Sequence, residues 1–151
     1  MGKGHAALRK GRASVPGQIY LVTFVTASRR PHFSAWTVAA QAASLLSSRA
    51  AWPDASLLAW VLMPDHWHGL VQLNGTADLA NCVGHCKGRT ARRLHERHPG
   101  LGPIWAKGFH DRALRRQDDL HAAARYVLMN PLRGGLVRRM GEYPYWDAVW
   151  L

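Results

Sequence analysis

Two apolar runs separated by only two residues constrain the fold of this chain more than any other feature. Residues 57–63 read LLAWVLM, residues 66–73 read HWHGLVQL, and Pro64-Asp65 stands between them. Short runs rich in β-branched and aromatic residues that meet at a tight connection predict an antiparallel hairpin. We therefore expect an antiparallel pair of strands in the middle of the chain.

Two further segments have the composition of strands. Residues 19–25 read IYLVTFV, an almost continuous apolar and β-branched run that is typical of a central, doubly covered strand. Residues 109–115 form a weaker candidate for a fourth strand. With the hairpin, they give four predicted strands.

Three segments have the periodicity of helices. Residues 36–49 are rich in alanine, residues 78–98 are basic, and residues 118–130 begin with two aspartates, either of which is a suitable N-cap. Pro131 disfavours helical geometry at the residue before it, so the third helix should stop at residue 130. In the first helix, one apolar face is predicted to contain Trp36, Ala39, Ala40, Ala43 and Leu46.

The predicted order is strand, helix, strand, strand, helix, strand, helix. This order matches an α+β ferredoxin-like sandwich (β-α-β-β-α-β) with an additional C-terminal helix. A chain of 151 residues is most simply one domain. We expect it to occupy residues 19–151 and to follow a flexible basic arm at residues 1–18.

The charge of the chain indicates a polyanionic partner. Lys and Arg total 20 against nine acidic residues, a formal net charge of +11. Nucleic acid is the first candidate and an anionic membrane surface the second, while a general solubility charge is the alternative explanation. No apolar stretch approaches the roughly 18 residues of a membrane helix. With nucleic acid ranked above a membrane surface, we expect no membrane partner. The two cysteines fit a reducing cytoplasm.

The stretch MPDHWHGL contains two histidines that a strand would place on one face. Side chains alternate along a strand, so His66 and His68 point one way and Trp67 points the other way. Their Cα atoms would lie roughly 6.5–7 Å apart, a separation from which two imidazoles can bind one metal ion. The alternative is a strand that carries two histidines by chance.

The stretch RYVLMNP in the third predicted helix contains a candidate nucleophile. Tyr126 and Asn130 are four residues apart and would lie on one helical face. A tyrosine hydroxyl can attack phosphorus as a covalent nucleophile if a metal ion and nearby arginines activate the phosphate. The alternative is an ordinary residue of an amphipathic helix.

Together these motifs resemble those of a known group of enzymes. The segments MPDHWHGL, VGHCKGRTARRL, IWAKGFHDRALR and ARYVLMNPLRGGLV occur in that order. They are similar to the REP-associated tyrosine transposases, a group of the single-tyrosine HUH transposase superfamily, over about residues 20–137. Members of this group cleave single-stranded DNA at hairpin-forming bacterial repeats (REP elements) through a 5′-phosphotyrosine bond.

The resemblance implies roles for individual residues. His66 and His68 match the metal-binding histidines, Tyr126 matches the nucleophile, and Asn130 matches a polar residue that can complete the metal shell. Asp65 stands where the group often has asparagine, and either a turn role or an additional carboxylate ligand is open to it. The implied cofactor is Mg²⁺ or Mn²⁺, with no small-molecule cofactor.

The resemblance also implies a partner and a location. The partner is single-stranded or hairpin DNA in the bacterial cytoplasm, at the nucleoid, bound by a monomer or alternatively by a homodimer. A catalytically inactive hairpin-binding protein of the same fold is the second functional class that fits these motifs.

Basic residues near these motifs are candidates for phosphate contacts, against the alternative of a solvated basic surface. The predicted DNA contacts are Lys87, Arg89, Arg92, Arg93, Arg112, Arg115 and Arg133. His110 and Asp111 are accessory candidates that could orient a ligand or contact a base. The aromatic residues at 143–150 are predicted to pack against the sheet rather than to stack on unpaired bases.

Overall fold

The computed structural model describes residues 17–115 and 118–150. The predicted arm at residues 1–18 lies outside this part of the chain apart from its last two residues. Within the described ranges, none of the helices combines the length and the apolar character that crossing a membrane requires.

Five strands form one sheet in the order β4-β1-β3-β2-β5, and all neighbouring strands are antiparallel. The strands are β1 (Ile19–Val25), β2 (Ala55–Met63), β3 (His66–Leu73), β4 (His110–Ala113) and β5 (Trp146–Ala148). The helices are α2 (Trp36–Ser47), α3 (Leu79–Arg97), α4 (Leu120–Leu128) and α5 (Asn130–Arg133). Short 3₁₀ turns are η1 (Ala27–Arg29), η2 (His32–Ser34), η3 (Arg49–Ala51), η4 (Pro99–Leu101) and η5 (Met140–Glu142).

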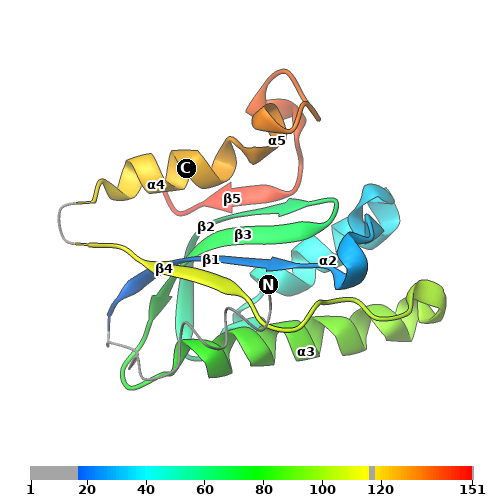
Figure 1. The fold of residues 1–151 in the computed structure, drawn as a ribbon, viewed down its shortest axis with the longest axis horizontal. Helices are drawn as coiled ribbons and strands as arrows, with labels where there is room; N and C mark the ends of the chain where they lie inside the picture. The colour runs from blue at the N-terminus through cyan, green and yellow to red at the C-terminus, as the bar shows by residue number, and fades with distance from the viewer. Residues whose placement is uncertain (1–16, 116–117, 151) are drawn as a thin grey trace.

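The predicted ferredoxin-like arrangement is confirmed. The hairpin of β2 and β3 forms as expected, and β1 inserts beside β3, so that β3 lies between β1 and β2. Helices α2 and α3 cover one face of the sheet, and α4 lies on the other face (Figure 1). The face that carries α4 is called the α4 face below.

Several elements differ from the sequence prediction, most of them by one or two residues at an end. Helix α2 ends at Ser47, two residues earlier than predicted, because the hydroxyls of Ser47 and Ser48 donate to the carbonyls of Ala43 and Leu45. Strand β4 is shorter than residues 109–115. Strand β5 was not predicted, since only three residues pair with β2, too few for a periodic pattern.

The predicted apolar face of α2 is only partly correct. Ala39, Ala43 and Leu46 are buried, as expected, but Ala40 is exposed and the side chain of Trp36 is 73% exposed. The buried face contains Val38 and Ala42 instead. Trp36, at the first turn of the helix, thus points away from the buried face despite its size.

The junction of α4 and α5 explains why the last helix is broken. Asp119 caps α4 by accepting from the backbone N–H of His121, at 2.9 Å. The helix ends at Leu128, two residues before the predicted stop, and resumes as α5 at Asn130. Proline at 131 has no N–H to give to the carbonyl of Val127. The side-chain amide of Asn130 donates to that carbonyl instead, at 2.8 Å.

Trp67 anchors β3 on the face opposite the histidines, as the strand alternation predicts. Its ring is fully buried and stacks on Phe24 of β1 and on Trp52. The indole also lies across Gly69, whose position leaves no room for a side chain. Close-packed aromatic rings on the opposite face of the sheet thus hold the strand that carries His66 and His68.

We expect Gly69→Ala to lower the free energy of unfolding by about 1–3 kcal/mol, as overpacking of a core does. A Cβ atom at this position would stand 2.5 Å from the Trp67 ring and 2.9 Å from the backbone oxygen of Ala59, which cannot move aside. Urea denaturation measures the change. Gly84→Ala is the matched control, because that Cβ would meet open space in the middle of a helix and should stabilise the protein slightly. Equal stability of wild type and Gly69→Ala would contradict the packing described here.

Candidate active site

His66 and His68 lie side by side along β3 on the α4 face. They stand opposite Val25 and Thr23 of β1 in the strand register. Residues nearby on the same face, Val61 and Leu70, are buried under α4. The structure therefore places both histidines next to the helix that carries Tyr126.

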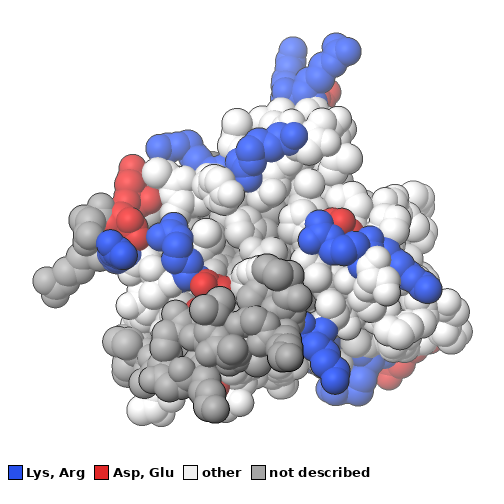
Figure 2. All heavy atoms as spheres, viewed as in Figure 1, with Lys and Arg blue, Asp and Glu red and all other residues white. Residues whose placement is uncertain are grey.

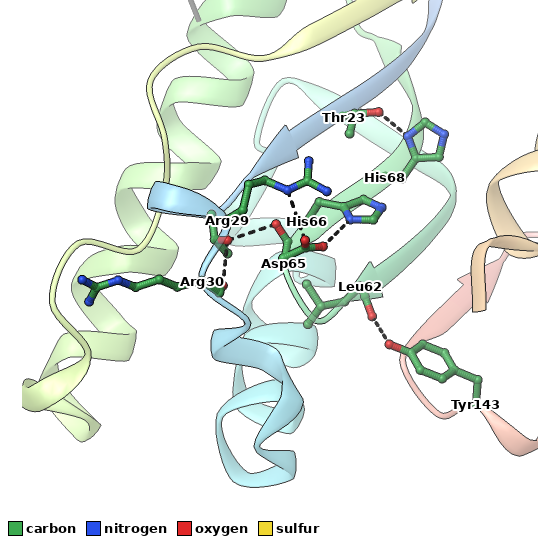
Figure 3. Close-up of polar contacts among 9 residues, drawn as sticks. Thr23, Arg29, Arg30, Leu62, Asp65, His66, His68 and Tyr143 are labelled. Atoms are coloured by element: carbon green, nitrogen blue, oxygen red, sulfur yellow. Dashed lines mark hydrogen bonds and ion pairs between the residues drawn. The ribbon is translucent and has the colours of Figure 1, made fainter. Parts of the chain in front are cut away.

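His66 is oriented by a charged pair. Its Nδ1 donates to Oδ1 of Asp65 at 2.8 Å, and Nε of Arg29 donates to the other carboxylate oxygen at 3.1 Å (Figure 3). Burial raises the pKa of Asp65, but the hydrogen bond from His66 and the charge of Arg29 outweigh it and hold the pKa below its usual value. Because a carboxylate only accepts, Nδ1 of His66 carries a proton, and in the neutral imidazole the lone pair is then on Nε2.

His68 is held in the same tautomer by backbone and hydroxyl groups. Its Nδ1 hydrogen-bonds Thr23 Oγ1 and lies 3.2 Å from the carbonyl oxygen of Val22, which can only accept. The side chain is 8% exposed, and burial together with the charge of His66 lowers the pKa of His68 to about 4. His68 is therefore neutral at physiological pH, with the lone pair on Nε2.

Tyr126 lies against the histidine pair in the same chain. Its ring makes an edge-to-face contact with His68, with a centroid separation of 6.0 Å, and its side chain is 56% exposed. On the ring's face, the guanidinium carbon of Arg133 lies 4.3 Å from the ring centroid, and Nη2 of Arg133 donates to the Tyr126 carbonyl at 2.7 Å. The residue is thus largely exposed while its ring contacts an imidazole and a cation.

Asn130 lies one turn beyond Tyr126, as the spacing predicts, but at the start of α5 rather than within α4. Its amide nitrogen is used to satisfy the Val127 carbonyl, as described above. The Oδ1 atom is the part of Asn130 that can act as a metal ligand. Asn130 therefore has a structural role whether or not it binds metal.

The arrangement of nitrogen atoms fits a two-histidine metal site. Both imidazoles have Nδ1 hydrogen-bonded to protein, which leaves Nε2 as the nitrogen that could face a metal; metal-binding histidines usually donate their other ring N–H to a protein group in this way. Within the described ranges, no cluster of three or more His, Cys, Asp or Glu residues could hold a metal ion. A metal ion at this pair would therefore need further ligands from another source, such as Asn130 Oδ1, water or a bound substrate.

Lys87 has a structural role that the sequence did not reveal. Its ammonium donates to the carbonyls of Ala106 and Gly108, at 2.9 and 2.7 Å, and lies over the Phe24 ring. Burial lowers the pKa of Lys87 to about 8. To contact DNA as predicted, Lys87 would have to give up both carbonyls.

The predicted basic contacts do not gather around the histidines. Helix α3 carries Arg89, Arg92 and Arg93 and packs on the face of the sheet opposite α4. DNA that these arginines bind would therefore lie away from the histidine pair. Among the described residues, lysines and arginines occur at several separate places on the view in Figure 2. Of the predicted arginines, only Arg133 contacts Tyr126 in the structure.

The residues on and after β4 divide between the two faces. His110 stands opposite Thr23 and so shares the α4 face with His68, whereas Asp111 stands opposite the buried Val22 and points to the other face. Arg112 shares the face of His110 and forms an ion pair with Asp118, at 3.4 Å. Arg115 is exposed beyond the strand. His110 and Asp111 therefore cannot act on one ligand at the site.

Two residues of the site were missed in the sequence. Thr23 orients His68, and Arg29 orients Asp65 and through it His66. The signal for Thr23 was a single polar residue inside the apolar run IYLVTFV. Nothing in the sequence singles out Arg29 from its neighbour Arg30.

The fold is similar to two solved structures. One is the REP-associated tyrosine transposase bound to a REP hairpin, with a TM-score of 0.66 and 22% identity over 89% of this chain and 79% of the other. The second is a transposase candidate from Deinococcus radiodurans R1, with a TM-score of 0.59 and 23% identity over 77% of this chain and 90% of the other. At these identities the comparisons support the fold.

Sequence comparison identifies the family. A REP-associated tyrosine transposase of Escherichia coli K12 is 27% identical over 88 residues, which span 58% of this chain and half of the relative's length. The family model described as "Transposase IS200 like" matches residues 14–129, most of the chain. The chain belongs to the IS200-like transposase family.

Proposed function

We propose that this protein cleaves and rejoins single-stranded or hairpin DNA through a covalent bond to Tyr126. The observation that carries the proposal is the contact between the Tyr126 and His68 rings within one chain. It brings a candidate nucleophile next to a candidate metal pair without a second subunit. Membership of the IS200-like transposase family supports DNA as the substrate.

The proposed cleavage exchanges one phosphoester bond for another. The Tyr126 oxygen attacks the scissile phosphorus, the bond from phosphorus to the 3′ oxygen breaks, and that oxygen takes up a proton as the 3′-hydroxyl. The phenolic proton is released to solvent, and the 5′ phosphate remains on the tyrosine. Attack by another 3′-hydroxyl reverses the exchange and joins the strands, so no ATP is consumed.

The histidines supply the ligands for the cation that the proposal requires. A Mg²⁺ or Mn²⁺ ion bound by Nε2 of His66 and His68, with Asn130 Oδ1 as a third ligand, would polarise the scissile phosphate. Imidazole ligands favour Mn²⁺ over Mg²⁺, whereas phosphodiester chemistry accepts both. His68 fits this role because it is neutral and its tautomer is fixed.

Arg133 is proposed to assist the nucleophile. Its guanidinium lies over the tyrosine ring, where a positive charge stabilises the negative charge that develops on the phenolic oxygen. The hydrogen bond to the Tyr126 carbonyl also holds Arg133 in place. We therefore propose that Arg133, predicted from the sequence to contact DNA, contacts it at the phosphate that Tyr126 attacks.

A solved structure of similar fold and the site geometry support a substrate and an assembly state. A protein of similar fold is described as bound to a REP hairpin, and we propose a hairpin with single-stranded flanks as the substrate here. Since Tyr126 reaches the histidines of its own chain, we propose that the monomer is the active unit. We place its action on DNA in the bacterial cytoplasm.

Incubation with a labelled DNA hairpin tests the proposal. We expect a covalent protein–DNA adduct that resists denaturing gel electrophoresis, forms with Mn²⁺ or Mg²⁺, and is absent when EDTA removes the divalent ions. Mass spectrometry of the adduct should place the 5′ phosphate on residue 126. Binding without an adduct under every divalent ion would instead identify a hairpin-binding protein that lacks catalysis.

Asp65→Ala tests the orientation of His66. Loss of a carboxylate that orients a metal-binding histidine typically costs about 10–100-fold in metal affinity, and we expect Mn²⁺ affinity to fall in this range. Isothermal titration with Mn²⁺ measures the change. Asp54→Ala, at the other end of the hairpin, is the control and should leave the affinity unchanged. An unchanged affinity in Asp65→Ala would show that His66 is held without the carboxylate.

A further inference from the structure

A fully buried threonine lies directly after β1, beside the turn that leads into the histidine strand. The side chain of Thr26 has no exposed surface, and in the described part of the chain the other buried polar residues are His68 and Thr90. A buried hydroxyl costs free energy unless it is hydrogen-bonded. Its bonding partners therefore indicate what Thr26 does at this position.

Thr26 binds the residue that orients His66. The backbone N–H of Thr26 donates to the carbonyl of Asp65 at 2.9 Å. The hydroxyl oxygen lies 3.1 Å from the same carbonyl and 2.8 Å from the carbonyl of Arg30. Because carbonyl oxygens only accept, the hydroxyl is the donor in both contacts. Thr26 thus joins Asp65, 39 residues away in the chain, to the turn that follows β1.

Thr26 also holds the residue that pairs with Asp65. The backbone N–H of Arg29 donates to the carbonyl of Thr26 at 3.0 Å. The Arg29 side chain pairs with the Asp65 carboxylate, which accepts from His66 (Figure 3). Both members of the charged pair that orients His66 are therefore hydrogen-bonded to Thr26.

The turn needs such a contact because its backbone is strained. Ser28 and Arg29 have φ values of 55° and 54°, and they are the only residues other than glycine with positive φ in the described part of the chain. This conformation costs free energy and persists only where the surrounding structure imposes it. The bonds from Thr26 to Arg29 and Arg30 span the strained residues and hold them in place.

The ion pair of Arg29 and Asp65 is too open to solvent to fix the turn by itself. The Arg29 side chain is 60% exposed and the Asp65 side chain is 29% exposed. Water and salt weaken an ion pair at the surface, and such pairs contribute little to stability. The position of Asp65 therefore depends on its buried contacts, and Thr26 provides one through its N–H and one through its hydroxyl.

We propose that Thr26 is a positioning residue of the histidine site, whose hydroxyl fixes Asp65 and the strained turn of Arg29 and thereby orients His66. The inference rests on the proposed function in one respect, because it takes His66 as a metal ligand. Thr26 itself contacts neither the metal nor the DNA. It acts only through Asp65 and Arg29.

Two substitutions of Thr26 separate its hydroxyl from its packing. Thr26→Val keeps the shape and loses the hydroxyl, whereas Thr26→Ser keeps the hydroxyl and loses a methyl group. We expect Mn²⁺ affinity, measured by isothermal titration, to fall about 10-fold in Thr26→Val, the lower end of the range for lost outer-shell partners of a metal ligand. Thr26→Ser should bind Mn²⁺ like the wild type. A packing role predicts the opposite order.

Nuclear magnetic resonance of the metal-free protein, with ¹⁵N-labelled histidine, gives a second measurement. In Thr26→Val the Nδ1 proton of His66 should exchange with water several-fold faster than in the wild type. The Nδ1 proton of His68 should exchange at an unchanged rate, because Thr23 and the carbonyl of Val22 hold that imidazole. An equal change at both histidines would show a general loosening of the fold and would overturn the inference.

Thr90→Val is the matched control. Thr90 is as fully buried as Thr26, but it lies on α3, on the other side of the sheet from the histidines. The same chemical change at this position should leave Mn²⁺ affinity and proton exchange at His66 unaltered. Thermal unfolding checks the fold of each variant. Should Thr26→Val not fold, Thr26→Ser decides alone, because a loss of affinity in the serine protein would contradict a role of the hydroxyl.

The outcomes separate this inference from the proposed function, since exchange at His66 is measured without metal or DNA. If Thr26→Val frees the His66 proton and weakens Mn²⁺ binding while the wild type forms no adduct with a DNA hairpin, the positioning role stands and the cleavage proposal fails. If the wild type forms the adduct while Thr26→Val keeps wild-type exchange and affinity, the cleavage proposal stands and the positioning role fails.

Discussion

Tyr126→Phe is expected to abolish the covalent protein–DNA adduct while leaving hairpin binding close to that of the wild type. The substitution removes one oxygen atom and keeps the ring that packs against His68 and under Arg133. Phenylalanine has no nucleophile, so the first step of cleavage cannot occur. The large effect on chemistry and the small effect on binding distinguish a nucleophile from a residue that only contacts DNA.

Denaturing gels measure the adduct, and gel shift under native conditions measures binding. Tyr145→Phe is the matched control, because Tyr145 is a half-buried tyrosine that packs on Tyr143 near β5 and not on the histidines. It should form the adduct at the wild-type rate. An adduct in Tyr126→Phe would assign the chemistry to another residue and would contradict the proposal.

Replacement of His68 is expected to lower the rate of adduct formation by on the order of 100-fold or more, because the proposed cation at the phosphate would lose one of its two imidazole ligands. Both His68→Ala and His68→Gln should also lose Mn²⁺ binding in isothermal titration. His68→Gln keeps most of the side-chain volume at this buried position. It therefore separates loss of a ligand from loss of packing.

The control for this prediction is His85→Ala. His85 lies on α3, on the other side of the sheet, and its Nε2 hydrogen-bonds the carbonyl of Ala50. The substitution should change neither Mn²⁺ affinity nor the rate of adduct formation. Thermal unfolding of each variant reports whether the fold is intact. Wild-type rates in His68→Gln, with the fold retained, would show that His68 is not a ligand.

Much of the fold was predictable because burial leaves a local pattern in the sequence. Strands β1 and β3 begin and end where predicted, since their apolar runs are long and are bounded by turns. Strand β5 could not be predicted, because three residues become a strand only by pairing with β2. The end of α4 was displaced because Asn130 repairs the hydrogen bond that proline removes.

The sequence alone determined which residues are able to form the site. The two-residue period of a strand places His66 and His68 on one face, and this period depends on the backbone and not on the rest of the fold. The motif at Tyr126 indicated a nucleophile in the same local way. The identity of the residues is thus a property of short segments.

Only the tertiary structure decided that these residues meet. Tyr126 reaches His68 because Ala124 and Val127 of α4 pack on the face of the sheet that carries the histidines. Thr23 and Arg29 act on His68 and Asp65 from 45 and 36 residues away in the chain. Contacts between distant segments depend on how the apolar surfaces of separate elements fit together. That fit has no period along the sequence. It places Tyr126 beside His68 and brings Thr23 and Arg29 to the residues that they orient.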